Sequence, residues 1–109
     1  MKQISANELK ARIDAGEKIK LVNAMEENKF RAKHIPGSLN IYDRPGIQAS
    51  LSKSDDIIVY CTDKACNKSI LLYYLLDAMG YKNICRFAGG LVEWENCGYK
   101  LDGEVVNQS

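Results

Sequence analysis

The sequence lacks a long hydrophobic run, an excess of charge of either sign, and an apolar leader. No apolar stretch in the 109 residues approaches the roughly 20 residues that a membrane-spanning helix needs. The first residues, Met1 to Ser5, hold one lysine and no apolar segment of the kind found in secretory signals. The formal net charge is +1, without the basic excess typical of nucleic-acid-binding proteins. We therefore expect a cytoplasmic protein, or a domain excised from a larger protein, that binds neither membrane nor nucleic acid.

The sequence also lacks the cysteine and histidine spacing of a zinc site. Successive cysteines are separated by 5, 19 and 12 positions, whereas zinc ligands come in closely spaced pairs. The only histidine, His34, lies far upstream of all of them. Without a secretory signal, reduced thiols are the expected state, and no metal or organic cofactor is predicted. The cysteines are Cys61, Cys66, Cys85 and Cys97.

Apolar and polar residues alternate in a way that predicts one α/β domain over residues 1–109. The length suits a single compact domain, and strands that alternate with helices indicate βαβ units with a mostly parallel sheet. The polar tail, residues 102–109, is expected to fray. Helices are predicted after the capping box Ser5 to Glu8 and over 26–33, 69–79 and 91–96; strands over 19–24, 38–42, 56–60 and 83–87; and a loop with one helical stretch over 43–54.

The strand over 56–60 is the most informative of these elements. Its apolar residues, Ile57 to Tyr60, follow one another without alternation, which is typical of a strand buried on both faces. Ligands of such sheets bind at the carboxyl ends of strands, and Cys61 follows this end directly. The N-terminus of the next helix favours a thiolate, the nucleophilic form of cysteine. Position alone fits equally well a small buried cysteine that fills the strand end.

The loop between this strand and the helix holds the candidate site residues. Curled loops of this kind direct backbone N–H groups inward and bind anions; Lys64 and Lys68 would strengthen that effect, and Asp63 would oppose it. Cys66 is a candidate to resolve a modified Cys61 by forming a disulfide, which requires Cα atoms within about 7 Å. Otherwise Cys66 is a loop residue without a role. The loop comprises Cys61, Thr62, Asp63, Lys64, Ala65, Cys66, Asn67, Lys68 and Ser69.

Several motifs follow one another along nearly the whole chain: Ile4-Ser5 with Glu8-Leu9, His34-Ile35-Pro36-Gly37-Ser38, Ile57 to Cys61, Gly80-Tyr81 with Asn83-Ile84, Gly89-Gly90 with Trp94, and Gly98-Tyr99. In this order they resemble the rhodanese (sulfurtransferase) family. The resemblance implies an α/β fold with a five-stranded parallel sheet flanked by helices. It also implies that Cys61 stands at the position of the persulfide-forming cysteine. The Cys-x4-Cys-Asn-x-Ser loop is similar to a variant of that family.

The sequence departs from this family at two places. The related phosphatases and arsenate reductases need a Cys-x5-Arg loop that clamps an oxyanion, but Asn67 occupies the arginine position, so neither activity is expected. The usual Asp-x-Arg at the end of the first core strand is replaced by Asn23-Ala24-Met25. An ion pair typical of the family is therefore absent.

The resemblance implies a sulfurtransferase or sulfur carrier. Cys61 would take sulfur from thiosulfate, another small anionic donor, or a persulfide-donating protein, and pass it to a thiol or cyanide. Two alternatives stay open: a thiol redox protein that uses Cys61 and Cys66, and a non-catalytic rhodanese-like binding module. The remaining residues receive structural interpretations. Cys85 and Cys97 are expected to pack near the last strand and helix, His34 to support its turn, Trp94 to anchor the core, and Gly89-Gly90 to serve a turn or close approach.

Overall fold

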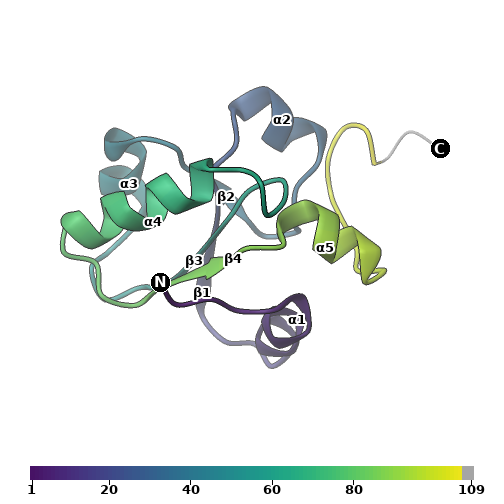
Figure 1. Cartoon of the computed structure of the whole chain (residues 1–109), viewed down its shortest axis with the longest axis horizontal. Helices are drawn as coiled ribbons and strands as arrows, with labels where there is room; N and C mark the ends of the chain where they lie inside the picture. Colours follow the sequence, from purple (N-terminus) through teal and green to yellow (C-terminus); the bar gives the residue numbers. More distant parts are fainter. Residues whose placement is uncertain (107–109) are drawn as a thin grey trace.

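The computed structural model describes residues 1–106, which form a parallel sheet with helices on both faces (Figure 1). The strands lie in the order β2-β1-β3-β4, and β3 pairs with β1 on one side and β4 on the other. The elements are α1 (Ala6–Asp14), β1 (Ile19–Asn23), α2 (Glu27–Ala32), β2 (Leu39–Asn40), α3 (Arg44–Ser50), β3 (Asp56–Tyr60), α4 (Lys68–Ala78), β4 (Ile84–Phe87) and α5 (Gly90–Asn96). The expected parallel α/β architecture is confirmed.

The sheet has four strands rather than the five that the family resemblance implied. Where a fifth strand would lie, the N-terminal segment makes a single parallel bridge from Gln3 to Arg86 at the outer edge of β4. Two backbone hydrogen bonds accompany this bridge, from Ile4 N to Arg86 O and from Arg86 N to Lys2 O. Ser5 then caps α1 by accepting from Glu8 N at 3.2 Å. The chain turns into a helix before a strand can extend.

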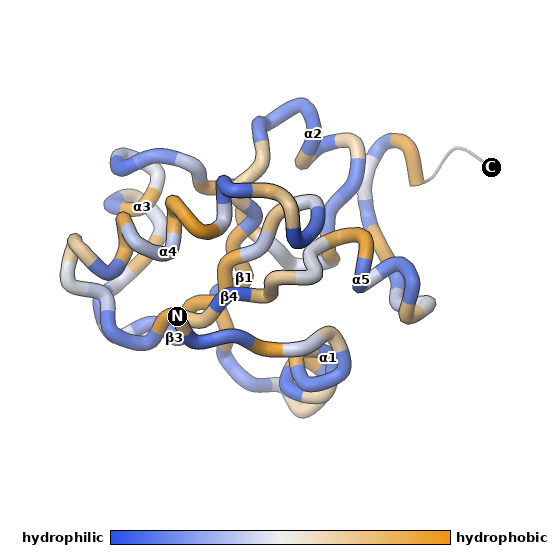
Figure 2. The backbone as a smooth tube through the Cα atoms, viewed as in Figure 1, coloured by the Kyte–Doolittle hydropathy of each residue, from blue (hydrophilic) through white to orange (hydrophobic). Residues whose placement is uncertain are grey.

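The side chains of β3 divide the core into two clusters. Ile58 and Tyr60 face α1 and α5, while Ile57 and Val59 face α3 and α4, because successive residues of a strand point to opposite faces. All four are completely buried. Figure 2 shows the orange, apolar segments concentrated along the central strands, with polar residues on the outer turns. β3 is therefore enclosed on both faces of the sheet over Ile57 to Tyr60.

The tail was expected to fray from residue 102, but its described part, residues 102–106, makes backbone hydrogen bonds. Asp102 and His34 exchange both backbone hydrogen bonds, at 2.8 and 2.9 Å, in an isolated antiparallel bridge. Glu104 N and Val105 N donate to carbonyl oxygens at the end of α2. Residues 107–109 lie outside the described residues, so the expectation for them stays a prediction. Among residues 1–106, no helix is both long and apolar enough to span a membrane.

Candidate active site

Cys61 follows the last residue of β3 and is almost completely buried. Its carbonyl oxygen accepts a hydrogen bond from Leu91 N at 3.1 Å, and the carbonyl of Thr62 accepts from Val92 N at 3.0 Å. The first turn of α5 therefore fixes the backbone at the start of the loop. Gly90 makes this approach possible: its φ is 59°, and a Cβ at this position would overlap the carbonyl oxygen of Cys61. The expected need for glycine in this turn is confirmed at Gly90.

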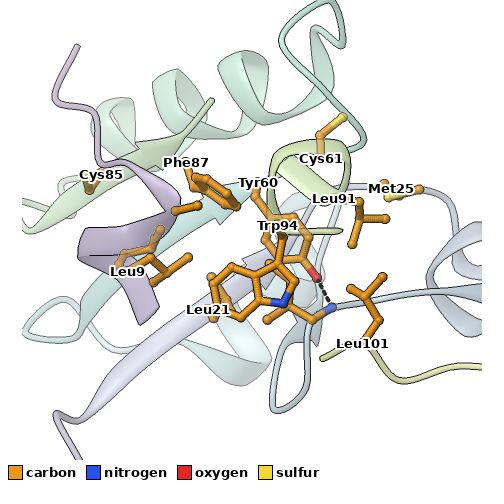
Figure 3. Packing of buried hydrophobic residues seen from close by; sticks show 13 residues of the cluster. Leu9, Leu21, Met25, Tyr60, Cys61, Cys85, Phe87, Leu91, Trp94 and Leu101 are labelled. Atoms are coloured by element: carbon orange, nitrogen blue, oxygen red, sulfur yellow. Dashed lines mark hydrogen bonds between the residues drawn. The ribbon is translucent and has the colours of Figure 1, made fainter. Parts of the chain in front are cut away.

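Cys61 forms a disulfide with Cys66, and their Cα atoms are 6.4 Å apart. This separation satisfies the limit of about 7 Å for a disulfide. Figure 3 shows the sulfur of Cys61 pointing away from the aromatic side chains of the core cluster. Cys66 is half-buried and packs against the same cluster. The two loop cysteines are thus brought together, in an oxidised state that differs from the reduced thiols expected from the sequence.

Asp63 shapes the turn between the two cysteines. Its carboxylate accepts from Ala65 N at 3.0 Å, and its carbonyl accepts from Cys66 N at 3.2 Å. Within residues 1–106, the amides of Asn67 and Ser69 at the start of α4 have no protein acceptor. Such groups carry the positive end of the helix dipole. The sulfur atoms of the disulfide thus lie on a loop that leads into a helix N-terminus with free donors.

The two lysines, Lys64 and Lys68, affect the electrostatic potential at Cys61 less than the sequence suggested. Lys68 Nζ lies 3.0 Å from Glu26 Oε1, and this hydrogen bond lowers the pKa of the Glu26 carboxyl. Lys64 is exposed, and no carboxylate pairs with it among residues 1–106. Water surrounds exposed charges and weakens their effect. We therefore assign little of the electrostatics at Cys61 to either lysine.

Arg86 of β4 is a buried cation beside the loop that the motif analysis missed. Its side chain is only 5% exposed, and its Nε donates to Ser69 Oγ at 2.9 Å. Among the described residues, Nη2 of Arg86 has no hydrogen-bond acceptor. An arginine inside the otherwise apolar strand Ile84–Phe87 was the available signal. The structure thereby gives Ser69, one of the candidate loop residues, a buried basic partner.

Tyr60 links β3 to the segment around His34. Its hydroxyl accepts from Ile35 N at 3.0 Å and lies 2.9 Å from Ser38 Oγ. Burial raises the pKa of Tyr60 above the ordinary value of 10.0, against the opposing effect of these hydrogen bonds. His34 Nδ1 donates a 2.7 Å hydrogen bond to Phe30 O, and the imidazole stacks on the Phe30 ring. Both residues therefore position the turn around His34.

The other two cysteines have contrasting surroundings. Cys85 is buried in the core, and this burial raises the pKa of its thiol, as befits a packing residue. Cys97 is exposed at the end of α5, so the packing role predicted for it is wrong. α5 ends at Asn96, and Cys97, the residue that follows it, is exposed to solvent. Trp94, one turn earlier, is buried and donates to Lys100 O at 2.8 Å, which confirms its role as an anchor.

Two hollows border the loop. One, of about 490 Å³, lies between the loop and α5; the other, of about 460 Å³, lies between the start of α4 and the segment after β1. Within residues 1–106, no three His, Cys, Asp or Glu side chains gather as metal ligands do. The first hollow is lined by Asp63, Lys64, Ala65, Gly89, Val92, Glu93, Asn96 and Cys97.

Comparison with known proteins places these features in a family. Residues 5–97 match the model of the rhodanese-like domain. The chain is 28% identical over 97 residues to "Putative sulfurtransferase YtwF" of Bacillus subtilis, covering 87% of this chain and 91% of that protein. It is 30% identical over 101 residues to the HTH-type transcriptional regulator Rv0324 of Mycobacterium tuberculosis, covering 91% of this chain but only 44% of the regulator.

Solved structures agree on the fold. The rhodanese-like domain of the Anabaena protein Alr3790 superposes with a TM-score of 0.89 at 24% identity, covering 100% of this chain and 84% of that one. The thiosulfate sulfurtransferase of Pseudomonas aeruginosa superposes with a TM-score of 0.79 at 19% identity, covering 94% of this chain and 20% of that one. Identities this low support the fold alone. The match to the family model, together with the shared fold, establishes that the chain belongs to the rhodanese-like domain family.

Proposed function

We propose that the protein is a sulfurtransferase in which Cys61 carries sulfur as a persulfide and Cys66 resolves it. The observation that carries this proposal is the position of Cys61, at the carboxyl end of the central strand and before the free amides of α4. Membership in the rhodanese-like family and the similarity to a relative named as a sulfurtransferase support it. The residues proposed to surround the reacting sulfur are those of the loop 61–69.

The first step needs the reduced protein. The thiolate of Cys61 attacks the outer sulfur of an anionic donor such as thiosulfate, a new S–S bond forms, and sulfite leaves with the electrons of the broken S–S bond. A persulfide on a donor protein reacts in the same way, with a thiolate as the leaving group. The helix N-terminus favours the anionic form of sulfur throughout. Since the nucleophile is already ionised, no side chain is required as a general base.

The persulfide of Cys61 then has two outcomes. An external thiolate or cyanide attacks its outer sulfur, takes that atom and leaves the thiolate of Cys61. Alternatively, the thiolate of Cys66 attacks the sulfur of Cys61 itself, which releases hydrosulfide and forms the disulfide seen between the two residues. An external dithiol then reduces this disulfide and is oxidised in turn. We propose a reducing compartment such as the cytoplasm for this cycle.

Intact-protein mass spectrometry tests the proposal. The reduced chain is incubated with thiosulfate or polysulfide beside the variants Cys61→Ser and Cys66→Ser, with Cys97→Ser as the matched control for an exposed thiol. We expect one added sulfur that accumulates in Cys66→Ser, disappears in Cys61→Ser and persists in Cys97→Ser. In the unmodified chain the sulfur should be released as hydrosulfide while two hydrogens are lost. Sulfur gain that survives in Cys61→Ser would refute the proposal.

A second function is favoured by one observation, the Cys61–Cys66 disulfide. A thiol redox protein would cycle this pair between dithiol and disulfide without carrying sulfur. Loss of two hydrogens with no sulfur gain in any variant would favour that function over sulfur transfer. If neither change occurs, the fold serves as a binding module, and both chemical functions are excluded for these donors.

A further inference from the structure

Arg86 is a buried charge whose purpose the fold alone does not explain. The residue is only 5% exposed, and an arginine guanidinium carries a positive charge in proteins. Within residues 1–106, Arg86 takes part in no ion pair; the ion pairs of that region involve other, exposed side chains. An isolated buried charge is strongly unfavourable unless an opposite charge or hydrogen bonds compensate it. One hydrogen bond, to Ser69, is present, and Nη2 has no acceptor.

The position of Arg86 relates it to the loop. Its Cα is paired with Val59, two residues before Cys61, on the adjacent strand. Its guanidinium lies against Ser69, in the first turn of α4 and three residues after Cys66. The positive end of the α4 dipole is at the same place. A buried guanidinium and a helix N-terminus therefore meet at the start of α4, where the loop that carries the two cysteines ends.

We propose that Arg86 is a positioning residue whose charge stabilises the anionic sulfur of Cys61, as thiolate or persulfide, once the disulfide with Cys66 is reduced. This inference rests on the proposed function in one respect, that Cys61 is the reacting thiol. The disulfide is neutral, so in the oxidised protein the guanidinium has no counter-charge among residues 1–106. Reduction by an external dithiol supplies that charge: the dithiol gives two electrons and two protons and becomes a disulfide, the Cys61–Cys66 bond breaks to two thiols, and loss of the Cys61 proton to water leaves an anion at the end of β3. Ser69 holds the guanidinium in place through its hydroxyl.

Other charged groups lie on the loop or on the elements around it, and each can influence the ionisation of Cys61. Asp63 and Lys64 lie on the loop itself, Lys68 is paired with Glu26, and Glu93 of α5 accepts a 2.9 Å hydrogen bond from Ala6 N. At the edge of β4, Lys2 N donates to Tyr73 Oη of α4. All of these are at least partly exposed, so water weakens their effect on Cys61. Arg86 differs from them because its charge is buried.

The test measures the ionisation of Cys61 without any sulfur donor. In the full chain carrying Cys66→Ser and Cys97→Ser, the rate of alkylation of Cys61 by iodoacetamide is followed against pH, with the modified residue located by mass spectrometry. Arg86→Gln removes the charge but keeps a side chain able to donate to Ser69; Arg86→Lys keeps the charge. We expect the midpoint to rise by about one pH unit, equivalent to about tenfold less thiolate below it, in Arg86→Gln but not in Arg86→Lys.

An unchanged midpoint in folded Arg86→Gln would overturn the inference and leave Arg86 a structural residue. If Arg86→Gln does not fold, the chain with native Arg86 is measured instead. A Cys61 midpoint at or above the ordinary thiol value of about 8.5 overturns the inference. A midpoint below this value, retained in Arg86→Lys, supports the inference. The two proposals fail separately. If the chain gains sulfur but the alkylation midpoint does not move in Arg86→Gln, sulfur transfer is supported and the role of Arg86 is refuted. If the midpoint moves but no sulfur is gained, the role of Arg86 is supported and sulfur transfer is refuted.

Discussion

Two neighbouring parallel strands, β1 and β3, end at the same edge of the sheet and yet present very different chemistry. After β1, the side chain of Asn23 accepts from Met25 N at 2.8 Å, and Asn40 Nδ2 donates to the carbonyls of both residues. After β3, the chain enters the loop 61–67, which ends where α4 begins at Lys68. In this loop Asp63 accepts hydrogen bonds from backbone amides. One strand end satisfies its own polar groups, whereas the other leaves amides free beside a cysteine.

This difference identifies what makes a strand end suitable for chemistry. The carboxyl ends of all strands in a parallel sheet meet at one edge, so topology alone does not select the site. Asn23 is completely buried and occupies the place where the family resemblance implies an ion pair. It replaces that pair with hydrogen bonds to the backbone. The β3 end is the proposed site because it combines a cysteine with backbone donors that have no acceptor within residues 1–106.

The substitution with the greatest expected consequence is at Cys61, the proposed nucleophile at the β3 end. Cys61→Ser should reduce sulfite release from thiosulfate to the background rate, because a serine hydroxyl is not ionised near neutral pH and is a poor nucleophile for sulfur. Cys97→Ser, which removes an exposed thiol outside the disulfide, should retain the rate of the unmodified chain. Sulfite release is measured at steady state with cyanide as acceptor. Equal loss in both variants would contradict the assignment.

The next effect concerns the contact that holds the β3 end in place. Gly90→Ala should lower the free energy of unfolding by about 2–3 kcal/mol, because alanine is strained at a φ of 59° and its Cβ would overlap the carbonyl oxygen of Cys61. Gly98→Ala is the matched control, with a φ of 79° and open space around it; it should lose only about 1 kcal/mol. Urea denaturation measures both. Similar losses would mean that strain alone acts and that the contact with Cys61 is unimportant.

The comparison predicts that the β1 end contributes stability and not chemistry. Asn23→Ala leaves Met25 N without its side-chain acceptor in a buried setting and should lower the free energy of unfolding by about 1–3 kcal/mol. The alkylation midpoint of Cys61 in the folded variant should stay where it is. A shift of that midpoint by about one pH unit would show that the two strand ends are not independent.

Tyr60, the last residue of β3, allows a prediction about how the stability of the fold depends on pH. Tyr60→Phe removes the acceptor of Ile35 N and should cost about 1–2 kcal/mol at neutral pH. Because burial raises the pKa of Tyr60 above 10.0, the folded state favours the neutral phenol. The contribution of the neutral phenol to stability is fully present below pH 10.0. It is lost as the pH rises through the higher pKa that Tyr60 has in the folded state. Stability measured from pH 9 to 12 should therefore decline less steeply in Tyr60→Phe; parallel curves would contradict this.

The smallest expected effect is at the ion pair that bridges the two ends. Lys68→Ala removes the exposed partner of Glu26, and the urea midpoint should barely change because water screens such pairs. The pKa of the Glu26 carboxyl, which Lys68 lowers, should rise towards its usual range, as NMR titration would detect. A marked loss of stability would mean that this pair holds the loop against the β1 end.

Much of the fold was readable from local patterns. The capping box predicted the start of α1, the unbroken apolar run predicted β3, and helix periodicity predicted α4 to within a residue at each end. Cys61 at a strand end followed from that run without knowledge of the rest of the chain. These features depend on neighbours in sequence, because capping and periodicity act over three or four residues. The strand expected over 38–42 was overestimated, since β2 pairs only at Leu39 and Asn40.

The sequence by itself determined the alternation of strands and helices, the buried strand and the cysteine at its end. Tertiary structure decided the rest: that Cys61 and Cys66 come within bonding distance, that Arg86 lies under the first turn of α4, and that the N-terminal segment makes a bridge instead of a fifth strand. It also decided that Cys97 faces solvent while Cys85 does not. The physical reason is that burial, and the pairing of buried polar groups, depend on residues far apart in the chain. No local pattern specifies which of them will meet.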